Sequence, residues 1–225
     1  MRIFAAFAAV FFLIPLPPAA AQATHPVSGR TIAPVMGVGG APWLVRPERE
    51  AEEDPARSLE LLGLKPGMMV GDVGCGVGYW SLRMAEKVAP GGRVYASDIQ
   101  PEMLRLLRER MKKAGVTNVE PVSATETSPE LPEGTLDLAI MVDVYHELSK
   151  PEAVLASIAR SLKPDGRLVL LEYRKEDTWI PIREEHKMSV ATVRQELEAA
   201  GYRFVGVTSD LPWQHLFVFR KPVVQ

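Results

Sequence analysis

Residues 70–81 combine an acidic side chain with three alternating glycines in the sequence VGDVGCGVGYWS. An apolar run ends at Asp72, and the glycines that follow allow a tight turn and a close approach of a ligand to the backbone. These glycines are Gly74, Gly76 and Gly78. Tyr79 stands where a dinucleotide fingerprint needs its third glycine, so the G-x-G-x-x-G spacing is not met. The carboxylate of Asp72 would repel a pyrophosphate, but it suits a cofactor that carries an ammonium and a sulfonium.

A second acidic residue, Asp98, ends the strand-like segment 93–98, twenty positions after Gly78. An acid at the tip of the second strand, about this far along, is placed to accept hydrogen bonds from the two hydroxyls of a ribose. Ile99 and Gln100 would then lie beside an adenine. The alternative is that Asp98 simply caps the helix that begins near Pro101.

The elements that must position these residues alternate along the chain between strand-like and helix-like segments. Strands are predicted near 68–73, 93–98, 118–122, 137–143, 166–173, 203–208 and 214–220, and helices near 54–62, 79–88, 101–114, 151–162 and 189–200. Such alternation predicts an α/β fold with a Rossmann-like, doubly wound sheet of seven strands. The short link 209–212 suits an antiparallel pair, so the sheet should be mostly parallel with an antiparallel last strand.

The N-terminus has the pattern of a secretory signal peptide: a basic start at Arg2, an apolar run over 3–16, and small residues that fit a cleavage site. We therefore predict a signal peptide at 1–23, an irregular arm at 24–53 and one catalytic domain at 54–225. The expected location is periplasmic or secreted, with cytosolic retention as the alternative. We expect no stable membrane anchor after signal cleavage.

Composition limits the partners of the protein. The formal net charge is −2 over 225 residues, and removal of Arg2 with the signal makes it −3, which argues against a general nucleic-acid-binding protein. The single cysteine, Cys75, excludes an internal disulfide. The charged run 48–53 is expected to be a solvated helix face.

Several segments together resemble the class I S-adenosylmethionine-dependent methyltransferases, in the branch that includes ubiquinone/menaquinone-biosynthesis enzymes. The resemblance covers about residues 43–221 and rests on 72–78 (DVGCGVG), 95–103 (YASDIQPEM), 136–140 (LDLAI), 142–147 (VDVYHE) and 162–168 (LKPDGRL). It implies S-adenosyl-L-methionine as cofactor and O-, N- or C-methylation of a small-molecule acceptor. The cofactor-binding residues that follow are Asp72, Gly74, Gly76, Gly78, Asp98, Ile99, Gln100 and Asp143.

The catalytic candidates lie after the fourth predicted strand. Ligands of open α/β sheets bind at the carboxyl ends of the strands, so this end, and Glu172 at the end of the fifth strand, should face the methyl group. A base is needed only if the acceptor carries a proton, and His146 is the best-placed candidate, followed by Tyr145 and Glu147. The alternative for His146 is a structural histidine bonded to backbone.

Four further residues are placed less firmly by the sequence. His186 is expected to be a solvated loop histidine, with a place in the acceptor pocket as part of a lid as the alternative. Carboxylates and histidine gathered at this end could also bind a metal, but no metal site is assigned because a clear second and third ligand are missing. Trp43, Arg46 and Arg49 of the arm either cover the cofactor or pack on the side of the domain. Two rival functions remain: a non-catalytic S-adenosylmethionine-binding protein, and a nicotinamide-dependent oxidoreductase, which Asp72 and Tyr79 disfavour.

Overall fold

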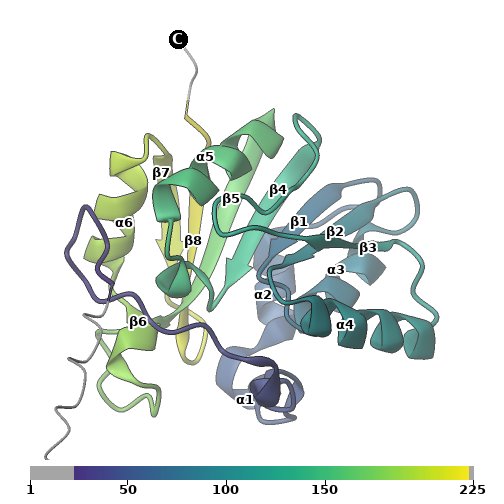
Figure 1. The fold of residues 1–225 in the computed structure, drawn as a ribbon, viewed down its shortest axis with the longest axis horizontal. Coiled ribbons are helices and arrows are strands. Elements are labelled where there is room, and N and C mark those ends of the chain that lie inside the picture. The colour runs from purple at the N-terminus through teal and green to yellow at the C-terminus, as the bar shows by residue number, and fades with distance from the viewer. Residues whose placement is uncertain (1–22, 223–225) are drawn as a thin grey trace, which may run out of the picture.

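A mixed sheet of eight strands forms the centre of residues 23–222, the part of the chain that this computed structural model describes (Figure 1). The strands lie in the order β3-β2-β1-β4-β5-β8-β7, and β6 pairs with β5 beside this row. They are β1 (Met69–Val73), β2 (Arg93–Asp98), β3 (Val119–Ser123), β4 (Leu136–Val142), β5 (Leu162–Arg174), β6 (Lys187–Met188), β7 (Arg203–Thr208) and β8 (Gln214–Arg220). The last strand, β8, runs antiparallel to both β5 and β7, and the other strand pairs are parallel, which confirms the predicted fold class.

Helices pack on both faces of the sheet, and the central strands show why. Successive side chains of a strand point to opposite faces, so a strand covered on both sides reads as a continuous apolar run. In β4, Leu138 and Ile140 pack with α3 and α4, whereas Ala139 and Met141 pack with α5 and α6. The helices are α1 (Arg49–Glu53), α2 (Pro55–Leu62), α3 (Tyr79–Val88), α4 (Pro101–Ala114), α5 (Pro151–Ser161) and α6 (Val190–Ala199).

Two details of the sheet differ from the sequence prediction. The sheet has an eighth strand, β6, which follows a loop. It is only two residues long, which is too short for an alternating apolar pattern to predict it. Residues 163–165, which the sequence analysis left between a helix and a strand, lie inside β5: the pairing with β4 jumps from Leu162 to Arg167 while the partner advances only from Leu136 to Leu138. The extra residues form a bulge in a continuous strand.

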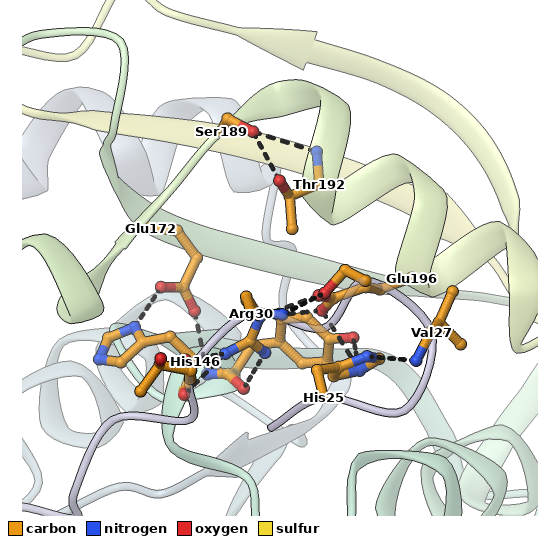
Figure 2. Close-up of polar contacts among 11 residues, drawn as sticks. His25, Val27, Arg30, His146, Glu172, Ser189, Thr192 and Glu196 are labelled. Atoms are coloured by element: carbon orange, nitrogen blue, oxygen red, sulfur yellow. Dashed lines mark hydrogen bonds and ion pairs between the residues drawn. The ribbon is translucent and has the colours of Figure 1, made fainter. Parts of the chain in front are cut away.

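The N-terminal arm crosses the α6 side of the domain before it reaches α1 (Figure 1). Glu196 of α6 is buried and accepts hydrogen bonds from Ser28 and from Arg30 Nε, the latter at 2.9 Å, while His25 Nε2 lies 3.3 Å from its other oxygen. Arg30 also donates to the main-chain oxygen of His146 at 3.0 Å. The arm is therefore tied both to α6 and to the turn that follows β4 (Figure 2).

The charged run 48–53 is not the solvated helix face that the sequence suggested. It forms α1, in which Arg49 and Glu53 are buried and face each other through two hydrogen bonds of 2.7 and 2.6 Å. Because the pair satisfies its own charges, it can be enclosed where isolated charges could not.

The predicted signal peptide falls almost entirely on residues 1–22, which lie outside the described part of the chain. Among residues 23–222, no helix has both the length and the apolar character needed to cross a membrane.

The contacts of Glu196 generate a test of the arm. Glu196→Gln keeps the size of the side chain but removes the charge that Arg30 needs, and a hydrogen bond to a charged group contributes about 1.5–3 kcal/mol. We expect faster amide hydrogen exchange across residues 25–36 and a lower free energy of unfolding in urea. Glu198→Gln is the matched control, since its pair with Arg194 is exposed. Equal exchange in the two variants would show that the arm does not depend on Glu196.

Candidate active site

A cavity of about 710 Å³ opens at the carboxyl ends of β1, β2, β4 and β5. Most residues that the sequence singled out line it. These are Asp72, Gly74, Gly76, Asp98, Ile99, Gln100, Asp143, His146 and Glu147. Parallel strands end at the same edge of a sheet, which is why residues as distant in sequence as Asp72 and Tyr173 share one cavity.

Gly78 and Tyr145 are not among the residues that line this cavity. Gly78 immediately precedes α3 at a φ of 80°, and a Cβ there would lie 2.3 Å from Leu107 Cδ1, so the glycine allows the loop to pack closely on α4. Tyr145 is fully buried, and its hydroxyl lies 3.3 Å from His25 Nε2 in the arm. The structure thus places both residues outside the cavity wall, and their predicted roles in cofactor binding and catalysis stay predictions.

Asp98 connects the glycine loop to the start of α4. Its Oδ2 accepts the backbone N–H of Gly76 and its Oδ1 that of Gln100, both at 2.8 Å. Burial raises the pKa of Asp98 above its usual value, while these N–H groups oppose the shift. Each carboxylate oxygen has a second lone pair, so Asp98 is able to hold the loop and still accept from a ligand hydroxyl.

Asp72 ends up almost enclosed beneath the glycine loop. Its Oδ2 accepts a 2.5 Å hydrogen bond from Ser81 of α3. Burial raises the pKa of Asp72 from 3.8 to about 6, which the hydrogen bond from Ser81 partly offsets. A group with such a shift on a cavity wall is suited to a cationic ligand, because a nearby cation would favour the ionised form.

Asp143 follows β4 in a backbone conformation that side-chain-bearing residues rarely adopt, with φ at 53°. Gln214 donates to its Oδ2 at 2.8 Å, but among the described residues its buried Oδ1 has no hydrogen-bond partner. Burial, and then the charges of Glu53 and Glu172, raise the pKa of Asp143. An unpartnered carboxylate oxygen held in a strained turn on the cavity wall is a site for a ligand donor.

His146, Glu147 and His186 form another part of the cavity wall. Glu172, fully buried at the end of β5, accepts the N–H of Tyr145 at 2.9 Å, and its Oε2 lies 2.6 Å from His146 Nδ1 (Figure 2). The other ring nitrogen, Nε2, lies 3.0 Å from Nδ1 of His186. Burial raises the pKa of Glu147 to about 7 and lowers that of His186.

The arm closes one side of the cavity with residues 34–36 and with Trp43, Arg46 and Arg49. Gln100 donates from Nε2 to the main-chain oxygen of Met36 at 2.9 Å, which fixes the arm over the loop after β2. The guanidinium of Arg46 stacks 3.6 Å from the centre of the Trp43 ring. Of the two placements that the sequence left open for these residues, the structure has the one over the cavity.

Several cavity residues were not placed there by the sequence analysis. Residues 124–126, just after β3, carried no motif. His186 was expected in solvent, but its side chain is only 20% exposed and contacts His146. The two histidines are 40 positions apart, on different turns, so no local pattern could pair them.

In sequence and in fold, the chain is similar to known methyltransferases. Residues 70–166 match the family model described as a methyltransferase domain. A ubiquinone/menaquinone biosynthesis C-methyltransferase UbiE from Ectopseudomonas mendocina is 34% identical over 119 residues, which are 52% of this chain and 46% of that protein. The matched region thus spans about half the length of such curated relatives.

The solved structures extend the likeness to most of the chain. A SAM-dependent methyltransferase from Aquifex aeolicus is 32% identical with a TM-score of 0.78, covering 82% of this chain and 98% of that one. The [4+2]-cyclase SpnF has a TM-score of 0.63 at 18% identity, covering 75% of this chain and 81% of that one. The second likeness shows the fold alone.

The burial of Asp72 predicts that its ionised carboxylate, which suits a cationic ligand, lowers the stability of the ligand-free protein. Its carboxylate costs nothing when protonated, and the cost grows as the pH rises from about 4 to about 6, because the folded protein binds the proton more tightly than the unfolded chain. The shift corresponds to on the order of 3 kcal/mol above pH 6. Asp72→Asn should therefore stabilise the ligand-free protein at pH 7.5, with a gain that shrinks toward pH 5.

Urea unfolding at the two pH values measures this difference. Asp210→Asn, at an exposed loop position, is the control and should change stability little at either pH. A variant at position 72 that is less stable than wild type at pH 7.5 would contradict the electrostatic cost assigned to Asp72.

Proposed function

Because this chain belongs to the S-adenosylmethionine-dependent methyltransferases, we propose that it transfers the methyl group of S-adenosylmethionine to a small-molecule acceptor. The observation that carries the proposal is the single cavity with two chemically different ends. Asp72, Asp98 and the glycine loop form one end, and the His146–Glu147–His186 group forms the other.

The cofactor end fits S-adenosylmethionine on three features of this structure. The glycines Gly74 and Gly76 leave no Cβ on the wall, Asp98 keeps lone pairs for a ribose diol, and the unpartnered Oδ1 of Asp143 is available to an ammonium. When bound, the cofactor supplies an electrophilic methyl group, whose bond to the sulfonium sulfur breaks with the electron pair passing to sulfur. Met36 and Trp43 of the arm line the cavity and would limit the access of water to a bound cofactor.

The acceptor end supports a small molecule with an apolar body and at least one polar group. Val35, Pro181 and Ile182 contribute apolar surface beside the polar group of His146, Glu147 and His186. Methyl transfer is an in-line displacement, so holding the acceptor atom against the methyl group supplies much of the acceleration. An acceptor that carries a proton would release it at this end, where His146 is held by Glu172. A quinone-like precursor, as the name of the UbiE relatives suggests, is one acceptor of this shape.

Asp98 provides the sharpest test of the cofactor site. Asp98→Ala should weaken S-adenosylmethionine binding by about 10–100-fold, since it removes two charge-assisted hydrogen bonds to the ribose. Calorimetric titration with S-adenosylmethionine, S-adenosylhomocysteine and NAD measures the effect, and we expect wild type to bind the first two and not NAD. Glu120→Gln, at an exposed pair with Arg93, is the control. Unchanged affinity in a folded Asp98→Ala protein would contradict the ribose assignment.

Release of S-adenosylhomocysteine in the presence of each member of a panel of acceptors separates an enzyme from a binding protein.

We also propose that the protein is exported and that residues 1–23 are its signal peptide, on the strength of the basic, apolar and small-residue segments alone. Mass spectrometry of the protein from its native host should then find an N-terminus at Gln22 or Thr24. An intact Met1 in the soluble cytosolic fraction would contradict export.

A further inference from the structure

From the arrangement of His146, Glu147 and His186 we propose that the acceptor end of the cavity binds one divalent transition-metal ion of the zinc type. Two imidazoles and a carboxylate converge there from two separate 3₁₀ turns, η3 (Tyr145–Glu147) and η4 (Glu184–His186). The two turns contact each other.

The distances between the three donor atoms suit a shared ion. His146 Nε2 lies 3.0 Å from His186 Nδ1 and 3.9 Å from Glu147 Oε1, and the remaining side of this triangle, between His186 Nδ1 and Glu147 Oε1, is 3.8 Å. Bonds of about 2.0–2.1 Å in a tetrahedral site place the donor atoms about 3.3 Å apart. A small approach of Glu147 and a slight separation of the two imidazoles therefore complete the three-ligand set.

The group behind His146 is the one that a metal-binding histidine needs. Glu172 accepts from Nδ1 at 2.6 Å and is itself held by the N–H of Tyr145. This contact assigns the proton to Nδ1 and leaves the lone pair of Nε2 directed at His186 and Glu147. Metal-ligating histidines are oriented by just such a carboxylate on the other ring nitrogen, which also makes the ligand more basic.

The donor set and its surroundings select the kind of ion. Two nitrogens and one oxygen favour Zn²⁺ and similar transition metals, whereas Mg²⁺ and Ca²⁺ prefer oxygen ligands throughout. All three side chains line the cavity, so an ion held by them keeps a coordination position open to it, as catalytic sites with three protein ligands do.

The role of the ion rests on the proposed function. A hydroxyl of the acceptor bound at the open position would be acidified and lose its proton to solvent. The resulting oxygen would then form the bond to the methyl carbon as the carbon–sulfur bond breaks. Binding of the ion itself does not depend on methyl transfer and is tested without it.

The experiment is a titration of the untagged full chain, treated with chelator, with Co²⁺ alone and with Zn²⁺ alone. We expect one Co²⁺ per chain with the intense visible absorption of a four- or five-coordinate site, displaced by Zn²⁺, and a higher melting temperature with Zn²⁺. His186→Ala and Glu147→Gln should abolish the band. Glu172→Gln should keep the band but weaken metal affinity by about 10–100-fold, as loss of a supporting carboxylate does.

His215→Gln is the matched control, because this buried histidine lies outside the cavity, with Ser209 and Glu176 as its partners. Failure of wild type to give the band, or a band that persists in folded His186→Ala, would overturn the metal site and leave the two histidines as a hydrogen-bonded pair. Affinity for S-adenosylmethionine is measured on the same samples. Binding of S-adenosylmethionine without binding of Co²⁺ would reject the metal site and leave the proposed function standing. Binding of Co²⁺ without binding of S-adenosylmethionine would reject the proposed function and leave the metal site standing.

Discussion

Three buried carboxylates and a partly buried one, Asp143, lie along one edge of the sheet, and the surrounding structure is organised by the need to satisfy them. They are Asp72 of β1, Asp98 of β2, Asp143 after β4 and Glu172 of β5. A buried carboxylate is tolerated only with hydrogen-bond donors or a counter-charge. Each therefore fixes a neighbouring segment. Asp98 holds the glycine loop and the start of α4, and Glu172 holds the turn after β4.

Asp143 and the charged residues of α1 differ in how fully their hydrogen-bonding groups are satisfied. Arg49 is bonded to Glu53, and Tyr173 donates its hydroxyl to the same glutamate at 3.1 Å, so α1 is packed into the domain by polar contacts. Asp143 receives one hydrogen bond from Gln214 and keeps an oxygen for a ligand. Because the pKa of Asp72 and that of Asp143 are both raised by burial, a cationic ligand would relieve a cost that the free protein carries.

The acceptor end shows how one geometry can serve two chemistries. The contact between Glu172 and His146 fixes the ring and frees Nε2 toward the cavity, which suits a general base and a metal ligand alike. The fold alone does not specify the chemistry of this site, because proteins of different activity share it, among them one named as a cyclase. The position of His186, within 3.0 Å of His146, is the feature that favours the metal.

The sequence by itself determined the parts of this protein that depend on local patterns. Helices α3 and α4 begin and end where capping and periodicity placed them, and Asp72 and Asp98 lie on the cavity because a glycine-rich turn and a short βαβ spacing are encoded within about 30 residues. The antiparallel last strand followed from the short link before it.

Only the tertiary structure decided which distant side chains meet. Arg49 reaches the cavity wall because the arm folds back, and His186 joins His146 because η4 packs on η3, neither of which a local pattern encodes. The same holds for two further residues: Tyr145 turns into the interior toward His25, and Gly78 lies against Leu107 of α4. Sequence patterns record the periodicity of each element, whereas a site made from several strand ends depends on the direction in which each side chain leaves its own element.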